Sequence, residues 1–158
     1  MSRYNLSEGK LDRKGISEKV VTMINLSTEF GQRVDQRLRD EEVICFTTVT
    51  PDGVAQSNPV WFFWDGESII LRQPGSYRIR NIQHNPKVTL NLERADVLGL
   101  NVVVIQEEAQ LKPDHLKPHP GYEKKYSKYL PEMNWTIDQL VADYSVEITI
   151  RPSRLRGD

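Results

Sequence analysis

The chain has 158 residues, in which 21 Lys and Arg nearly balance 22 Asp and Glu, and it carries a single cysteine. One cysteine excludes an internal disulfide and a structural zinc site built from cysteine pairs. The near-neutral charge argues against a general nucleic-acid coat, whose basic residues must outnumber its acids. No apolar run reaches the roughly 20 residues of a membrane-spanning helix, and the N-terminal residues have no apolar signal-peptide core. We therefore expect a cytoplasmic protein that contacts neither nucleic acid nor membrane.

The first predicted elements are an arm and a helix. We expect a polar N-terminal arm over residues 1–26 and one domain over residues 27–158. An amphipathic helix is predicted to begin near Ser27 or Thr28, either of which can act as its N-cap, because apolar side chains then recur every four residues between charged ones. Those apolar positions are Phe30, Val34 and Leu38.

Six strands are predicted from runs rich in β-branched and aromatic residues, or alternating between apolar and polar, that stop at turn residues. They cover residues 43–50, 54–64, 67–72, 87–94, 100–112 and 144–151. The first three follow one another through short glycine-containing turns and predict an antiparallel meander. A short helix is predicted over residues 76–84, ended by Asn85 and Pro86. Residues 113–142 form a proline-containing excursion with helical stretches at residues 122–129 and 136–142.

The order of these elements predicts the fold class. Helices are inserts between strands rather than regular partners of them, so a parallel sheet of βαβ units is disfavoured. We expect a mainly β protein, a six-stranded antiparallel barrel that is closed or partly closed, with accessory helices.

A segment without acidic residues is the most informative functional feature. Between Ser68 and Leu92 there is no Asp or Glu. The segment joins a strand end, a glycine-containing turn, a possible N-cap at Ser76 and a helix start, and backbone N–H groups and arginines meeting there would bind a phosphate. A solvated basic helix face is the alternative, although basic side chains at a helix N-terminus oppose its dipole unless an anion lies between them. The basic residues are Arg72, Arg78, Arg80 and Lys87.

The strand predicted over residues 54–64 carries two unusual features. Pro59 lacks an N–H for a ladder, so it marks either an edge or bulge, or a place where a flat heteroaromatic ring approaches the backbone. The aromatic run from Trp61 to Trp64 points to both faces of the sheet. At least one of those faces must therefore be covered by a partner subunit, a ring-shaped ligand or an added helix.

Signals for other chemistry are weak. His115 and His119 are four residues apart, but Pro118 and Pro120 break any helix that would bring them together, so we expect no metal site. Cys45 lies in a strand pattern without a histidine close in sequence and is interpreted as a small core residue. No catalytic triad, phosphate loop or dinucleotide fingerprint is present.

An ordered series of motifs resembles the pyridoxamine 5'-phosphate oxidase-like split β-barrel superfamily. The motifs are TTVTPDG at residues 47–53, SNPVWF at 57–62, WDGE at 64–67, QPGSYRIRNI at 73–82, NPKV at 85–88, DYSV at 143–146 and RPSRLRG at 151–157. Within this superfamily the chain looks most similar to the flavin/deazaflavin oxidoreductase branch B, in which many actinobacterial members use coenzyme F-420.

The resemblance implies a homodimer with two cofactor sites at the subunit interface, each lined by both chains. Position by position, it implies a strand whose backbone lines the flavin or deazaflavin ring (Ser57, Asn58, Pro59, Val60, Trp61), a strand end beside it (Leu71, Arg72, Gln73), phosphate contacts (Ser76, Arg78) and an asparagine that fixes the helix on the strand (Asn81). Arg78 stands where many relatives have Lys, and either residue holds a phosphate. Trp135, Arg154 and Arg156 would reach the partner's site.

The implied activity is hydride transfer to a small or planar organic substrate, for which the cofactor supplies the chemistry. Coenzyme F-420 is the favoured cofactor and FMN the alternative. A non-catalytic protein that binds a flavin, deazaflavin or tetrapyrrole is the third hypothesis. No catalytic acid or base is assigned, because a bound water or a tyrosine could each protonate the substrate. Oxidation of pyridoxamine 5'-phosphate itself is not expected, since it needs a second phosphate site and the sequence contains one acid-free cluster.

Overall fold

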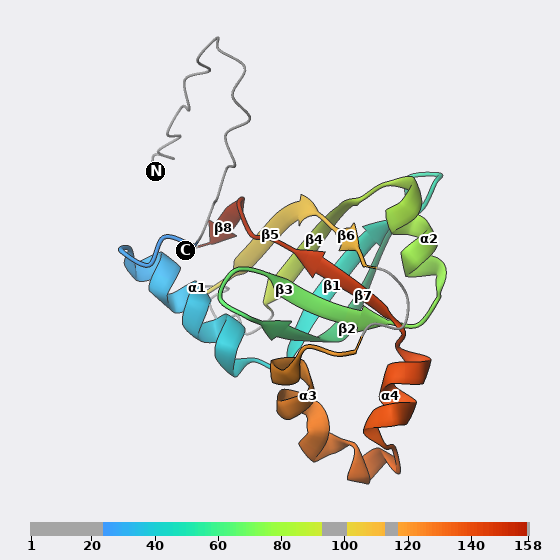
Figure 1. Cartoon of the computed structure of the whole chain (residues 1–158). Coiled ribbons are helices and arrows are strands. Elements are labelled where there is room, and N and C mark those ends of the chain that lie inside the picture. Colours follow the sequence, from blue (N-terminus) through green and yellow to red (C-terminus); the bar gives the residue numbers. More distant parts are fainter. Residues whose placement is uncertain (1–23, 93–100, 113–116, 158) are drawn as a thin grey trace, which may run out of the picture.

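The computed structural model describes residues 24–92, 101–112 and 117–157. Within these ranges the chain forms eight strands and four α-helices (Figure 1). The strands are β1 Val43–Val49, β2 Ala55–Trp64, β3 Ile69–Gln73, β4 Lys87–Leu92, β5 Val103–Glu108, β6 Gln110–Leu111, β7 Val146–Ile150 and β8 Leu155–Gly157. The helices are α1 Glu29–Asp40, α2 Tyr77–His84, α3 Pro120–Tyr126 and α4 Ile137–Asp143, with 3-10 turns at Ser127–Tyr129 and Pro131–Met133. The predicted arm lies outside the described residues except for residues 24–26.

The predicted amphipathic helix is confirmed as α1. Its N-cap is Thr28, whose hydroxyl accepts a hydrogen bond from the Gly31 N–H at 3.0 Å. Val34 and Leu38 are fully buried, as their four-residue spacing predicts. At 2.7 Å, the indole N–H of Trp64 donates to Asp35 and ties α1 to β2. Within the described residues, no helix is both long enough and apolar enough to cross a membrane.

The strands form one antiparallel sheet in the order β6-β7-β3-β2-β1-β4-β5-β8. β6 is at one end of that order and β5 is next to the other end, yet only Ala109 separates them in the sequence. The chain therefore links distant parts of the order, and the sheet curls on itself, as Figure 1 shows. Phe46 on β1, Leu90 on β4 and Ile105 on β5 are cross-strand neighbours in the barrel core, and none of them has solvent-exposed surface.

The prediction of six strands is wrong, because the structure has eight. The predicted strand over residues 100–112 changes partner at Ala109, whose N–H donates to the Pro86 carbonyl, so that β5 pairs with β4 and β6 pairs with β7. The last predicted strand stops before Pro152, which has no N–H for a ladder. The chain then resumes as β8 against β5, where Gly157 allows it to approach the Val102 carbonyl: a Cβ there would lie 2.2 Å from that oxygen.

A break in the pairing of β2 divides the sheet into two halves. Residues 55–61 of β2 pair with β1, whereas residues 62–64 pair with β3. β2 thus passes from a first half-sheet, with β1, β4, β5 and β8, to a second, with β3, β7 and β6. Among the described residues, no strand pairs with the second side of residues 55–61. Pro59 lies on this stretch, where β2 is locally an edge strand and a missing N–H costs no ladder bond.

Tyr126 of α3 closes the break in β2. Its hydroxyl accepts a hydrogen bond from the Phe62 N–H at 2.8 Å. It also lies 2.7 Å from the Glu42 carbonyl oxygen and 2.5 Å from that of Phe62, the two acceptors available to its proton. The β1–β2 ladder ends one residue earlier, at the Val43–Trp61 pair. The hydroxyl therefore pairs backbone groups that would otherwise be buried without a partner.

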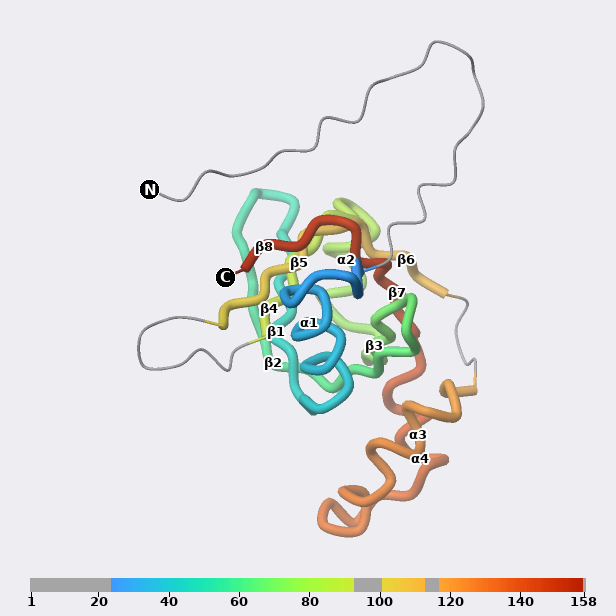
Figure 2. The backbone as a smooth tube through the Cα atoms, turned by 90° about the vertical axis from the view of Figure 1, so that its left-hand side faces the viewer, coloured from blue at the N-terminus to red at the C-terminus, as the bar shows by residue number. Residues whose placement is uncertain are grey.

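The aromatic run on β2 is covered on both faces by this chain. Phe62 and Trp64 point into the barrel core and are buried. Trp61 and Phe63 point outward against α3, where Trp61 stacks on Tyr126 with ring centroids 4.5 Å apart and planes 8° apart. Of the three predicted covers, an added helix is the one that the structure contains. Figure 2 shows α3 and α4 extending from one end of the barrel.

Tyr126→Phe should destabilise the protein by about 1–3 kcal/mol, because the buried Phe62 N–H and two carbonyls lose their shared partner. Tyr129→Phe is the matched control, since the Tyr129 hydroxyl bonds to the half-buried Glu42 carboxylate near the surface and not to the backbone of β2. Urea unfolding monitored by circular dichroism measures both losses. Equal losses in the two variants would contradict the assigned role of Tyr126.

Candidate functional site

A cavity of about 390 Å³ lies between the open edge of β2, the end of β3 and the helical excursion. It occupies the place where β2 and β3 separate, since their ladder stops at the Phe62–Leu71 pair. Six of the eleven predicted cofactor-binding residues line it: Pro59, Val60, Trp61, Arg72, Gln73 and Arg78. The other lining residues are Val43, Tyr122, Met133, Trp135, Leu140 and Tyr144. The structure thus brings two predicted segments, far apart in sequence, to the same cavity.

Four predicted residues lie beside the cavity and have other contacts. The Ser57 hydroxyl is 2.5 Å from that of Thr47, and the Asn58 amide donates to the Tyr77 hydroxyl at 2.9 Å. Leu71 is fully buried in the barrel core. None of these three side chains lines the cavity itself.

The fourth, Asn81, joins α2 to the first half-sheet, as predicted. Its buried amide donates to Thr48 of β1 and to Gln56 of β2, each at 3.0 Å. Two hydrogen bonds between buried side chains fix the position of α2 relative to the edge of β2. The start of α2 is therefore held at a defined place beside the cavity.

The start of α2 carries two buried polar atoms without hydrogen-bond partners among the described residues: Ser76 Oγ and Arg78 Nε. Ser76 is the N-cap of α2, but its side chain makes no capping hydrogen bond, and the first turn contains no acidic residue. Gln73 accepts a hydrogen bond from Arg78 Nη1 at 2.7 Å and orients the guanidinium. Buried donors left unpaired are costly unless something fills the place. The arrangement fits an anion at this point.

Arg72 lines the cavity but is already engaged by its own chain. Its side chain is fully buried, and its guanidinium reaches the Glu147 carboxylate at 3.3 Å and the Tyr144 carbonyl at 2.9 Å. Burial lowers the pKa of Arg72, while Glu147 opposes that shift. The resemblance placed Arg72 beside the cofactor ring; in the structure its charged end points to the segment that enters β7.

The excursion between β6 and β7 forms the wall opposite the β2 edge. The sequence indicated helices there, and both are confirmed, with a capping box at Thr136 and Gln139 beginning α4. Sequence reasoning missed Tyr122 and Tyr144 as cavity residues; the only signal was the density of aromatic residues in an otherwise polar segment. Trp135, which the resemblance assigned to the partner's site, lines the cavity of its own chain and packs 5.7 Å from the Tyr144 ring.

Tyr122 presents a protonated hydroxyl at this wall. The residue is 1% exposed, and burial raises the pKa of its hydroxyl above the ordinary value, with nearby Arg72 acting in the opposite direction. Among the described residues no hydrogen bond engages that hydroxyl. A group of this kind keeps its proton at neutral pH and can donate it inside the cavity.

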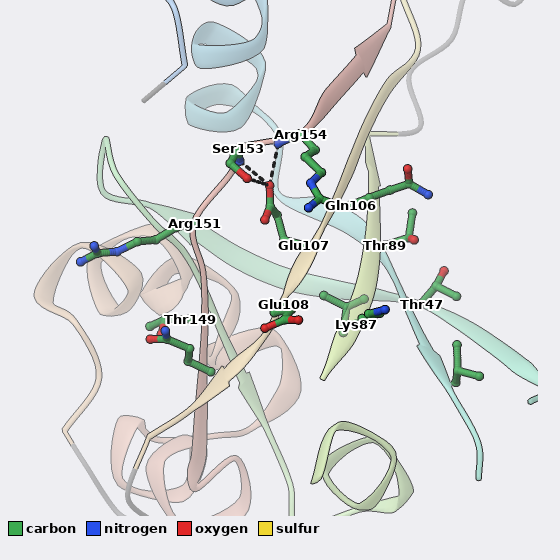
Figure 3. A pocket seen from close by; sticks show the side chains of 13 residues that line it. Thr47, Lys87, Thr89, Gln106, Glu107, Glu108, Thr149, Arg151, Ser153 and Arg154 are labelled. Atoms are coloured by element: carbon green, nitrogen blue, oxygen red, sulfur yellow. Dashed lines mark hydrogen bonds between the residues drawn. The ribbon is translucent and has the colours of Figure 1, made fainter. Parts of the chain in front are cut away.

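A second, larger cavity of about 770 Å³ lies where β5 and β7 part (Figure 3). Its lining is polar and none of the eleven predicted cofactor-binding residues belongs to it. Glu107 lies at one side of this cavity. Its carboxylate accepts hydrogen bonds from the N–H and hydroxyl of Ser153 and, at 2.6 Å, from the Arg154 N–H. These bonds tie the segment after Pro152 to β5. Arg154, also predicted to reach the partner's site, lines this cavity.

Of the two histidines spaced four residues apart, the structure describes His119. His115 lies outside the described residues, and the His119 ring stacks on Phe63 at 4.9 Å while its Nδ1 accepts from the Gly121 N–H. In the ranges that the structure describes, no group of three His, Cys, Asp or Glu side chains could hold a metal ion.

A family model described as pyridoxamine 5'-phosphate oxidase matches residues 30–143, most of the described chain. The chain belongs to this family. The match contains β1 to β4 and the excursion helices, and therefore every residue that lines the 390 Å³ cavity except Tyr144. No curated protein sequence matches the chain significantly.

Solved structures of low sequence identity share the fold. One described as an F420 reductase is 24% identical with a TM-score of 0.58, and the match covers 77% of this chain and 94% of that one. A conserved hypothetical protein from Mycobacterium tuberculosis is 20% identical with a TM-score of 0.61, covering 79% and 81%. The heme storage protein HutZ from Vibrio cholerae is 12% identical with a TM-score of 0.57, covering 82% and 95%. These likenesses establish a mainly β split-barrel fold.

Lys125 of α3 fixes the aromatic wall to the barrel. Its ammonium donates to the Glu41 carbonyl at 2.5 Å and to the Phe62 carbonyl at 3.0 Å, and it lies 4.1 Å from the centre of the Phe62 ring. Burial lowers the pKa of Lys125 from 10.5 to about 8. The folded protein therefore releases this proton at a lower pH than the unfolded chain does.

The stability of the protein relative to a Lys125→Met variant should rise with pH between about 8 and 10.5. In that window the unfolded chain binds a proton that the folded protein has released, and raising the pH removes the free energy of charging a buried amine. Urea unfolding at half-unit pH intervals measures the difference. Lys124→Met, on an exposed neighbour, is the control for removing a lysine from this helix. A wild-type advantage that falls with pH would contradict the assignment.

Proposed function

We propose that this protein is an oxidoreductase that binds a flavin-type cofactor in the 390 Å³ cavity, with coenzyme F-420 favoured over FMN. The observation that carries the proposal is the pair of buried, unpartnered atoms at the start of α2, Ser76 Oγ and Arg78 Nε, beside a cavity with an aromatic wall. One end of the cavity fits a phosphate and the rest fits a flat ring. Among solved structures with this fold, the one described as an F420 reductase supports the choice of cofactor and of the F-420-using branch of the family.

Different residues of this chain would bind the phosphate and the ring of the cofactor. Ser76 and Arg78 would hold the phosphate, with Gln73 fixing the orientation of Arg78. The open backbone edge of β2 at Pro59 and Val60 would line the ring, because no strand of the described residues pairs with it there. When bound, the cofactor supplies hydride transfer to an organic substrate.

The protein contributes the surroundings of the reaction. Trp135, Leu140 and Tyr144 form a wall that limits the access of water to the cavity. We assign the role of proton donor, which the sequence left open, to Tyr122, because its side chain is buried at the cavity and burial raises the pKa of its hydroxyl. It would protonate the substrate atom that gains negative charge after reduction.

A homodimer, as the resemblance implies, belongs to the proposal. The polar cavity between β5 and β7 contains Arg154, which the resemblance assigned to the partner's cofactor site. Light scattering on the purified protein should give twice the mass of the chain. A monomer at micromolar concentration would remove this part of the proposal.

A non-catalytic carrier is the second candidate, favoured by the structural likeness to a heme storage protein. Absorption spectra and mass spectrometry of the ligand released from purified protein distinguish the candidates. Recovery or tight binding of F-420 supports the favoured cofactor, FMN alone supports the alternative, and heme alone supports the carrier. Turnover of reduced cofactor with quinones, nitroaromatics or enones would rule the carrier out.

Arg78→Ala should weaken cofactor binding by on the order of 1.5–3 kcal/mol, about ten- to a hundred-fold in Kd, through loss of a charge-assisted hydrogen bond. Arg80→Ala is the control, because Arg80 is exposed on the same helix and does not line the cavity. Fluorescence titration of the folded variants measures both constants. Unchanged affinity in Arg78→Ala would place the phosphate elsewhere.

Tyr122→Phe should lower kcat by about a hundred-fold with little change in cofactor Kd, because a positioned proton donor contributes roughly that factor. Tyr129→Phe removes a hydroxyl outside the cavity and should leave kcat unchanged. Steady-state rates with a substrate that the enzyme reduces measure the effect. If kcat is the same in Tyr122→Phe and in the wild type, water rather than Tyr122 supplies the proton.

A further inference from the structure

Among the residues that the structure describes, Arg72 is the largest side chain that is fully buried. Placing a guanidinium in the interior is costly, and removing the partner of such a charge is costlier still. An aliphatic residue would satisfy the pattern of β3, whose other residues are buried as well. The position of this charge therefore calls for an explanation from its contacts.

All three acceptors of the Arg72 guanidinium lie within one short segment. Nε donates to the Tyr144 carbonyl at 2.9 Å, Nη2 to the Ser145 carbonyl at 3.4 Å, and Nη1 to the Glu147 carboxylate at 3.3 Å. Tyr144 is the C-cap of α4, with backbone angles (φ −110°, ψ 59°) that are neither helical nor extended. This is the hinge at which the excursion returns to the barrel. The Arg72 guanidinium thus fixes the direction in which the chain passes from α4 into β7.

The same end of β3 also holds the proposed phosphate contact. Gln73 donates to the Arg72 carbonyl at 2.8 Å and accepts from Arg78 at 2.7 Å. Two consecutive residues of β3 therefore position opposite sides of the cavity. Gln73 positions the anion end, and Arg72 positions the wall that carries Leu140 and Tyr144.

We propose that Arg72 is a positioning residue that sets the width of the ring-binding part of the cavity by fixing the Tyr144–Ser145 hinge, and that it is not a ligand of the cofactor phosphate. The inference rests on the proposed function for the identity of the ring but not for the role of the hinge. Arg72 therefore affects binding of the ring, through the position of the wall, whereas Arg78 binds the phosphate.

Hydrogen–deuterium exchange of the full chain without cofactor tests the hinge. Arg72→Met should raise exchange of the amides in residues 137–146 at least tenfold and leave β1, β4 and α2 unchanged. Arg72→Lys keeps the charge, but its single ammonium nitrogen cannot reach the three acceptors that the Arg72 guanidinium bonds through three nitrogens, so it should give a smaller rise at the same amides, and it serves if Arg72→Met does not fold. Val88→Ala, which removes core volume from β4, is the control for general destabilisation and should raise exchange across the barrel. Wild-type exchange at the hinge, or the Val88→Ala pattern in the Arg72 variants, would overturn the proposal.

Ligands with and without a phosphate test whether Arg72 and Arg78 affect different parts of the cofactor. The probes are FMN with riboflavin, or F-420 with its phosphate-free deazaflavin riboside, whichever pair the wild type binds. Arg72→Lys should weaken both members of a pair by the same factor, at least five-fold, whereas Arg78→Ala should weaken only the phosphorylated member. Loss confined to the phosphorylated ligand in Arg72→Lys would overturn the proposal. Failure of the wild type to bind either pair would instead overturn the proposed function, and the exchange experiment would still decide the role of the hinge.

Discussion

The change of partner by β2 between Trp61 and Phe62 is the constraint on which the rest of the structure depends. A strand that leaves one half-sheet for another leaves backbone groups unpaired at the crossing, and burying them without partners is costly. The Tyr126 hydroxyl meets that requirement by bonding to Phe62 and lying within reach of the Glu42 carbonyl. The excursion that carries Tyr126 is for this reason part of the barrel's stability as well as the wall of its cavity.

The same separation of strands creates the cavity. Once β2 and β3 diverge beyond the Phe62–Leu71 pair, an open strand edge faces the end of β3, and α2 begins a few residues later. The proposed cofactor needs apolar side chains around its ring and fixed donors for its phosphate, and the residues beside the diverging strands include both aromatic side chains and the start of α2. Asn81 and Gln73 keep the donors in place, so that the site is organised before any ligand arrives.

Arg72 lies in a segment that was correctly predicted to line the cavity, but its guanidinium bonds to its own chain. Gln73 and Arg78 meet at the cavity as the acid-free cluster predicted, and Arg72 lines it too, but the guanidinium of Arg72 is bonded to the Tyr144 carbonyl. Alternation along a strand predicts which face a side chain takes, not which carbonyl a long arginine reaches. The acceptors in this case, Tyr144 and Ser145, lie more than 70 residues away in sequence, so no local pattern could indicate them.

The sequence by itself determined the mainly β fold class, the start of α1 at Ser27 or Thr28, the position of α2 and the two segments that line the cavity, because turn residues, periodicity and charge clusters are local properties of the chain. Tertiary structure decided the rest. The number of strands rose from six to eight because the strand predicted over residues 100–112 changes partner at Ala109 and because β8 forms beyond the last predicted strand, and only the folded sheet shows both pairings. Tyr122, Trp135 and Tyr144 came to the cavity of their own chain because the excursion folds back over the open edge of β2, a contact between segments that depends on packing and not on sequence spacing.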